Sequence, residues 1–182
     1  DIRINHTLTK TGAGTLLLSG NNVYTGGTDI MEGTLQVNGT GIGDTSLVTL
    51  TPSRQTTLQL LANETIGRLQ GGGRNADSEY GTVAVGANTL TINQSATTTY
   101  SGFLTGTGSI VMNTGSTGNL NLNNLSSGFT GSVVVNGGLF QLSNIGQINA
   151  SSFTINKGGN LLIDNNGTTR SGTRILDTTP IT

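Results

Sequence analysis

The spacing of glycine and asparagine limits the fold of this chain more than any other feature of the sequence. Short segments in which apolar and polar residues alternate recur along the chain, and nearly every one is followed by Gly or Asn. Alternation with a period of two is typical of β-strands, while Gly and Asn allow the tight turns that end short strands. We therefore predict strands that include residues 16–18, 28–30, 35–37, 47–50, 58–60, 83–85, 90–92, 110–112, 120–122, 133–135, 140–142, 153–155 and 161–163.

One segment also fits a helix, Leu58–Leu69, with the sequence LQLLANETIGRL. The alternation in Leu58, Gln59 and Leu60 and the Thr-Ile-Gly sequence near the end suit strands equally well. We interpret the segment as two strands joined by a turn, and the chain as all-β.

Composition favours a folded chain with many small apolar clusters. Only 32% of the 182 residues are hydrophobic, which on its own is typical of disorder. Disordered chains also tend to carry high net charge and much proline, whereas this chain has a formal charge of −1 and two prolines.

The eight basic and nine acidic side chains form no basic run, so we expect no nucleic-acid partner. No apolar run approaches the roughly 20 residues of a membrane helix, so we expect no membrane insertion by this segment.

The chain contains no cysteine, so neither disulfides nor thiolate metal sites stabilise it. Its start, DIRINHTLTK, lacks the basic segment followed by an apolar one that a secretory signal has. Because both ends interrupt patterned sequence, we expect the chain to be part of a longer protein.

An internal repeat distinguishes between sandwich, barrel and solenoid. A shift of about 105 residues places residues 8–60 on 110–163, with Tyr24 on Phe129, and keeps the apolar positions in phase. A sandwich has no reason to return to the same phase after so many residues, but a coil of stacked turns does. At about 20 residues per turn, residues 1–182 form one β-solenoid of roughly six to nine turns.

A dense pattern of glycines, apolar residues and one aromatic residue marks the segment 8–39, LTKTGAGTLLLSGNNVYTGGTDIMEGTLQVNG. The pattern resembles the passenger-associated transport repeat, the autotransporter-associated β-strand repeat of bacterial surface proteins. Its positions are occupied by Lys10, Gly12, Gly14, Leu16, Leu18, Gly20, Asn22, Tyr24, Gly26, Thr28, Ile30, Gly33 and Leu35. The second copy retains Phe129, Gly131 and Gly138, but Met112 stands where Lys10 does.

The resemblance implies a right-handed parallel β-helix on the outside of a bacterium, at the cell surface or secreted, with the secretion machinery outside this segment. In such a coil we expect Leu16, Leu18, Ile30, Leu35 and Val37 to point inward. They would stack above Leu58, Leu60 and the inward residues that follow these two in the sequence, and the threonines would face outward. A single turn would not fold alone, because its apolar residues are buried only against neighbouring turns.

Few residues suit catalysis or metal binding. His6 is the single histidine, so a metal or nucleophilic site lacks a second His or Cys. Asp29 and Glu32 could serve as the carboxylate pair of a glycosidase, but the additional acids or basic cluster of such enzymes are missing around them. Gly71–Gly73 lacks the Lys and Ser/Thr that complete a phosphate-binding loop. We predict no catalytic residue, no cofactor and no metal.

The longest polar insertion, GGGRNADSEYG, is the strongest candidate for a protruding loop. Arg74, Asp77, Glu79 and Tyr80 in it could contact a ligand or partner. The alternative is a hydrated loop, because the glycine-aspartate nonapeptide of calcium-binding β-rolls is absent.

We expect a non-enzymatic extracellular β-helix that serves as a stalk, passenger or fibre segment and templates folding during secretion. Its partners would be adjacent repeats of the same chain, or further copies stacked end to end. The principal alternative is an adhesin module whose outer faces and loop bind host or matrix glycans or proteins. An enzyme that degrades polysaccharide has the least support.

Overall fold

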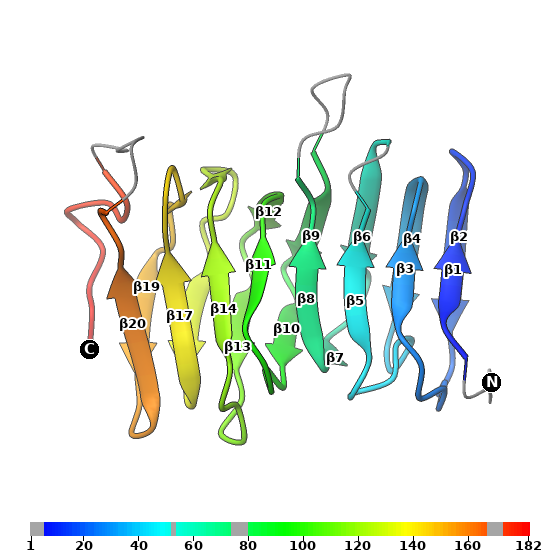
Figure 1. Ribbon diagram of the computed structural model, residues 1–182, viewed down its shortest axis with the longest axis horizontal. Helices are drawn as coiled ribbons and strands as arrows, with labels where there is room; N and C mark the ends of the chain where they lie inside the picture. Colours follow the sequence, from blue (N-terminus) through cyan, green and yellow to red (C-terminus); the bar gives the residue numbers. More distant parts are fainter. Residues whose placement is uncertain (1–5, 52–53, 74–79, 167–172) are drawn as a thin grey trace.

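The computed structural model describes residues 6–51, 54–73, 80–166 and 173–182. Within these ranges the chain forms twenty short β-strands and no helix. The strands lie side by side along one long axis, from β1 at one end to β20 at the other (Figure 1). The all-β prediction is confirmed.

Three parallel sheets form the sides of the coil. Sheet A contains β1 (Leu8–Lys10), β3 (Thr28–Ile30), β5 (Leu47–Leu50), β8 (Arg68–Gly71), β11 (Thr98–Tyr100), β14 (Asn119–Leu122), β17 (Gly138–Leu142) and β20 (Gly159–Ile163). Sheet B contains β2 (Thr15–Ser19), β4 (Gly33–Asn38), β6 (Thr56–Leu60), β9 (Thr82–Gly86) and β12 (Phe103–Gly106). Sheet C contains β7 (Glu64–Ile66), β10 (Thr89–Ile92), β13 (Ser109–Met112), β16 (Ser132–Val135) and β19 (Ser152–Ile155). The short strands β15 (Leu125–Ser126) and β18 (Gln147–Ile148) pair with each other.

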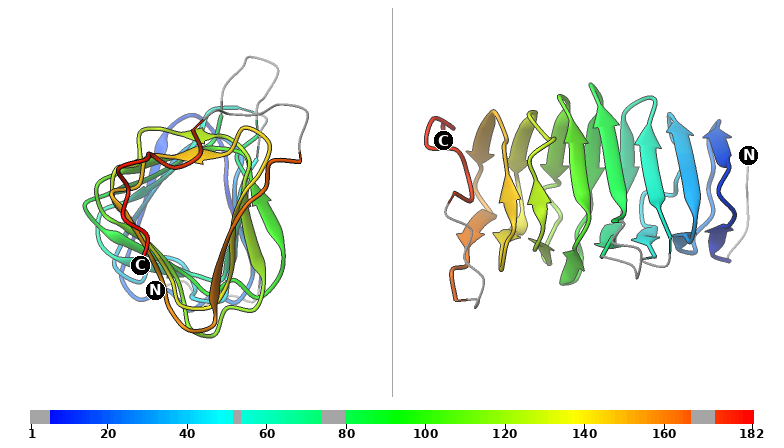
Figure 2. Two further views of the ribbon diagram at one scale, coloured as in Figure 1. Left: turned by 90° about the vertical axis from the view of Figure 1, so that its left-hand side faces the viewer. Right: turned by 90° about the horizontal axis from the view of Figure 1, so that it is seen from above.

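Successive strands of each sheet come from successive turns of the chain, and every strand pair is parallel. Seen along the axis, the turns superimpose as a coil with three sides (Figure 2). The eight strands of sheet A mark seven complete turns from β1 to β20. This confirms the predicted parallel β-solenoid. Its right-handed coiling stays a prediction.

Every segment predicted as a strand lies within an observed strand. The segment Leu58–Leu69, which also fitted a helix, contains the end of β6, all of β7 and the start of β8. Period-two alternation therefore identified strands even where they are short. The strands that were not predicted separately are β1, β7, β8, β11, β12, β15 and β18, which have two to four residues. Length alone does not explain this, because β3 was predicted and has three residues.

One continuous apolar column fills the inside of the coil. Leu16, Leu35 and Leu58 stack in register across β2, β4 and β6, as the alternation predicted. Ile30 is an exception. It lies in sheet A, next to Lys10 and Leu50 on the adjoining strands, and not above the leucines of sheet B.

Three threonines differ from the expectation that threonines face outward. The side chains of Thr28, Thr56 and Thr98 are buried. The Thr98 hydroxyl donates to the carbonyl oxygen of Leu69 at 2.6 Å, which offsets the cost of removing that hydroxyl from water. The Thr56 hydroxyl, by contrast, is buried without a hydrogen-bond partner, so an acceptor on the previous turn explains the burial of Thr98 but not that of Thr56.

The two copies of the sequence repeat lie on different sides of the coil. At the offset of 105 residues, β3 of sheet A corresponds to β16 of sheet C, and β4 of sheet B corresponds to β17 of sheet A. The second copy is therefore rotated by one side. All three sides require the same inward alternation and the same kind of corner, so one sequence pattern fits any two consecutive sides.

Candidate functional site

The described part of the solenoid contains no obvious catalytic or metal centre. Among its residues, no three or more His, Cys, Asp or Glu side chains are placed to hold a metal ion. In the same part of the chain, no helix has the length and hydrophobicity needed to cross a bilayer. The polar groups described next lie at the corners and on the outer faces of the coil.

Of the predicted contact residues, the structure describes only Tyr80, since Arg74, Asp77 and Glu79 lie outside the described ranges. Tyr80 is half-buried and packs against Phe103, with ring centroids 4.9 Å apart and ring planes inclined by 54°. The other aromatic side chains, Tyr24, Tyr100, Phe129, Phe140 and Phe153, are all buried in the core. The Tyr80–Phe103 pair is therefore the aromatic surface of the molecule.

Sequence reasoning missed Phe103, although a signal for it exists. Phe103 is the first residue of β12, where Leu104 faces inward with an exposed fraction of 1%. Alternation then places Phe103 outward, and it pairs in register with Thr82 of β9. An aromatic residue next to an inward leucine can thus be recognised as outward before a structure is known.

The outer face of sheet B is uncharged along its five described strands. Its outward positions are Thr15, Leu17, Ser19, Thr34, Gln36, Asn38, Thr57, Gln59, Thr82, Ala84, Phe103 and Thr105. Gln36 donates from its amide nitrogen to the amide oxygen of Gln59 at 2.9 Å. The outer face of sheet A differs, because it carries Asp29 and Arg68 around a shallow hollow of about 540 Å³.

Lys10, the first polar residue of the repeat motif, closes a corner of the coil from inside. Its side chain is only 6% exposed. The ammonium group donates to the carbonyl oxygens of Thr11, Gly12 and Glu32 at 2.9, 2.5 and 2.9 Å. All three N–H donors have an acceptor, so the buried charge is stabilised by carbonyl dipoles without a carboxylate. Lys10 thereby joins two turns.

The aromatic residue of the motif starts a chain of buried hydroxyl groups. The hydroxyls of Tyr24 and Thr28 lie 2.6 Å apart, and that of Thr28 lies 3.1 Å from the Ser46 hydroxyl. Ser46 donates to the carbonyl oxygen of Gly26 at 2.9 Å. Burial raises the pKa of Tyr24 to about 12, although the hydrogen bond with Thr28 acts in the opposite direction. The phenol therefore stays neutral and serves as a hydrogen-bonding group.

Two different structural constraints require glycine at most of the motif positions. Gly33 has φ +75°, and a Cβ atom there would lie 2.5 Å from the carbonyl oxygens of Gly12 and Gly14. Gly26 has an ordinary φ, but its Cβ would overlap the backbone of His6. Positive φ also occurs at Gly12, Gly20 and Gly138, and Gly131 approaches the backbone of Gly108. Nothing in the structure explains why Gly14 is glycine.

Glu64 marks the edge of sheet C. It is 3% exposed, and its two carboxylate oxygens accept hydrogen bonds from the backbone N–H groups of Gly41 and Ile42 at 3.0 and 3.1 Å. Burial raises the pKa of Glu64 to about 7, against the opposing effect of these hydrogen bonds, and the carboxylate of Asp44 raises it further. The side chain thus replaces ladder hydrogen bonds where the previous turn has no strand in sheet C.

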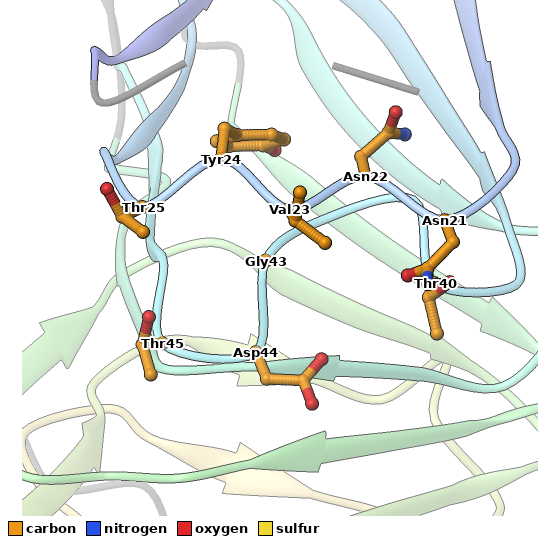
Figure 3. A pocket seen from close by; sticks show the side chains of 9 residues that line it. All are labelled: Asn21, Asn22, Val23, Tyr24, Thr25, Thr40, Gly43, Asp44 and Thr45. Carbon is orange, nitrogen blue, oxygen red and sulfur yellow. Dashed lines mark hydrogen bonds between the residues drawn. The ribbon is translucent and has the colours of Figure 1, made fainter. Parts of the chain in front are cut away.

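Where sheet C has no strand, the surface is hollowed. The two turns before β7 pass this side as irregular segments, and a hollow of about 240 Å³ lies between them. Figure 3 shows Asn21 and Thr40 at one end and Thr25 and Thr45 at the other. The Thr40 hydroxyl donates to the Asn21 side-chain oxygen at 3.1 Å. The lining is polar and shallow, and no catalytic group faces a general base across it in the described residues.

The structure separates the acids considered for glycoside hydrolysis. Asp29 lines the hollow on sheet A, whereas Glu32 pairs with Arg54 of the next turn at 3.8 Å. Arg54 is 69% exposed, so this ion pair contributes little to stability. His6 is exposed at the edge of the described chain.

Comparison with known proteins supports the resemblance found in the sequence. The profile of the family described as Passenger-associated-transport-repeat matches residues 8–37. The chain is 34% identical over 163 residues to the Adhesin BmaC autotransporter of Brucella suis biovar 1 (strain 1330). The aligned region covers 86% of this chain and 5% of that protein, so the chain spans about a twentieth of its relative's length. No solved structure matches.

Proposed function

Because the chain carries a passenger-associated-transport-repeat within a parallel β-solenoid, we propose that it is a non-enzymatic stalk segment of an autotransporter-like passenger. The segment would lie outside the bacterium, at the cell surface or in a secreted product. The single observation that supports this most is the continuous stacking of its turns, since each strand of sheet A pairs in parallel with the strand one turn away.

Stacked turns suit folding during export. A turn that emerges from a secretion channel finds the edge of the previous turn already formed, and its hydrogen bonds and apolar residues can be satisfied there at once. Lys10 and Glu64 strengthen this coupling, because both bond backbone groups of a neighbouring turn. Folding that proceeds turn by turn then disfavours return of the chain through the channel.

The same geometry suggests the partners of the segment. β1 and β20 each pair with a single strand of sheet A. Further turns of the same parent chain, or copies stacked end to end, fit these edges because they continue the parallel pairing.

A pair of deletions tests the stalk function. Ser109 of β13 and Ser132 of β16 are register partners, so removal of residues 109–131 takes out one complete turn. Removal of residues 109–118 deletes only one strand, β13 of sheet C, and so brings β14, a strand of sheet A, to the position of sheet C. Each variant would be placed between a reporter domain and an outer-membrane translocation unit, and surface display of the reporter measured.

We expect the whole-turn deletion to display the reporter as the wild type does, because all three sides close in register. The partial deletion should reduce display and make the exported segment sensitive to protease. Equal display from both deletions would show that stacking in register plays no part in transport, and loss of display from both would show that turns are not interchangeable.

Adhesion is the second candidate function. The relative aligned with 86% of the chain is named an adhesin. The observation in this molecule that favours adhesion is the Tyr80–Phe103 pair, since aromatic rings on the outside of a soluble protein are a common feature of binding surfaces.

A further inference from the structure

We propose that the outer face of sheet B around Tyr80 and Phe103 binds a neutral glycan. The platform consists of Tyr80, Thr82, Phe103 and Thr105, with Gln59 two strands away. This proposal rests on adhesion, the second candidate function, and gives it a location and a ligand class.

The aromatic pair supplies the apolar part of the platform. Both rings are partly exposed, and their 54° inclination prevents them from covering each other face to face. Phe103 occupies a column in which the other strands of sheet B place Thr15, Thr34, Thr57 and Thr82. The fold itself therefore does not require an aromatic ring at this position.

Hydroxyl and amide groups surround the rings. Thr82 lies beside Phe103 on β9, and Thr105 follows two residues along β12 on the same face. Gln59 accepts a hydrogen bond from Gln36 through its amide oxygen, so its amide nitrogen is the group that a ligand can use. A sugar ring has one apolar C–H face and a rim of hydroxyls, and this matches aromatic rings bordered by uncharged polar groups.

The lack of charged side chains on these strands distinguishes between neutral and acidic glycans as ligands. The outward positions on the described strands of sheet B carry no Asp, Glu, Lys or Arg, so these strands themselves offer no counterion to a sulfate or carboxylate. Asp29 and Arg68 belong to sheet A, on another side of the coil. A neutral oligosaccharide fits this face better than an acidic one.

A peptide strand fits less well than a glycan. Peptides that extend a sheet bind at an edge, where backbone N–H and C=O groups are unpaired. Phe103 and Thr105 lie on β12, the last strand of sheet B, but the N–H groups on its outer edge already donate to the next turn, from Leu104 to the Ser126 hydroxyl at 3.0 Å and from Gly106 to the Gly128 carbonyl oxygen at 3.1 Å. On the other side β12 is paired with β9, and β9 with β6. Only side chains are available here, as in the recognition of sugars.

The test uses the full 182-residue chain on an array of immobilised neutral, sialylated and sulfated oligosaccharides. The affinity of the strongest neutral binder is then measured by titration calorimetry for wild type and for Phe103→Thr. Threonine is the residue of the neighbouring strands in this column, so the substitution preserves the fold. Leu17→Thr, which changes an exposed residue on the same sheet far from the platform, is the matched control.

We expect neutral glycans to bind with little dependence on salt, and Phe103→Thr to weaken binding by about tenfold or more, while Leu17→Thr has no effect. Binding of acidic glycans alone, binding lost at high salt, no glycan binding, or equal affinity of Phe103→Thr and wild type would each overturn the proposal. Self-association that Phe103→Thr abolishes would assign the platform to a second copy and also overturn it.

The glycan site and the stalk function fail in distinguishable ways. Removal of residues 109–131 leaves both aromatic residues in place, so that variant should keep glycan affinity whatever its effect on display. Phe103→Thr should leave reporter display unchanged, because the side chain lies outside the core.

Discussion

The hydroxyl groups of Tyr24 and Thr28 form a buried hydrogen bond of 2.6 Å that the second copy of the repeat replaces as a unit. At the offset of 105 residues, Phe129 stands for Tyr24 and Val133 for Thr28, and both are buried. Phe129 and Val133 both lack a hydroxyl, so the second copy contains no unpaired hydroxyl group at these positions. The same two positions are thus filled by a hydrogen-bonded pair in the first copy and by two apolar side chains in the second.

This relationship predicts coupled stabilities at Tyr24 and Thr28. Thr28→Val alone leaves the buried Tyr24 hydroxyl without its partner and should lower the free energy of unfolding by about 1–3 kcal/mol. The double variant Tyr24→Phe/Thr28→Val removes both hydroxyls and should cost less than the sum of the single variants. Urea denaturation of the four proteins measures the coupling, and purely additive costs would contradict it.

Replacement of Lys10 by an apolar residue should destabilise the protein, although Met112 stands in its place in the second copy. Lys10→Met deprives three carbonyl oxygens of their donor and should lower the free energy of unfolding by about 2 kcal/mol. Lys157→Met, at an exposed lysine, is the control and should change it by less than about 0.5 kcal/mol. Thermal and urea denaturation compare the two variants, and equal effects would show that the carbonyl cage contributes nothing.

The two glycines Gly33 and Gly14 should respond oppositely to alanine. Gly33→Ala forces a Cβ into a positive-φ position against two carbonyl oxygens, and should cost more than about 1 kcal/mol. A Cβ atom at Gly14 would meet no other atom within 4 Å, and φ there is ordinary, so Gly14→Ala should be neutral or stabilising by about 0.4–1 kcal/mol. A destabilised Gly14→Ala in the same denaturation assay would contradict this explanation.

Glu64 should make the solenoid more stable in mild acid. Its pKa is about 7 in the folded chain against an ordinary value of 4.5, so folding takes up a proton between these values. The resulting stabilisation is complete below about pH 4.5 and is lost as the pH rises through about 7. Relative to Glu64→Gln, which keeps the shape but does not titrate, the wild type should gain about 2 kcal/mol between pH 8 and pH 5.

Denaturation of both proteins across this pH range measures the difference. Parallel pH profiles would mean that the hydrogen bonds from Gly41 and Ile42 keep the carboxylate charged throughout.

The inward alternation of this chain could be predicted from sequence because it depends on neighbouring residues only. Leu16, Leu35 and Leu58 stack as expected for that reason. The side of the coil on which a residue lies depends on the lengths of all intervening corners, and Ile30 was therefore assigned to the wrong side. Glu64 carried no local signal, since the N–H groups that it bonds lie more than twenty residues earlier in the sequence.

The central claim is that residues far apart in the sequence lie in one straight column, separated only by stacked turns. Asp29 of β3 and Gln141 of β17 occupy the same outward column of sheet A, five strand spacings apart. The chain has no cysteine, so Asp29→Cys and Gln141→Cys provide unique sites for two spin labels. Pulsed electron paramagnetic resonance should give a narrow distance distribution that corresponds to about 24 Å between the two Cα atoms. A broad distribution, or a mean distance far from this value, would contradict the stacked solenoid.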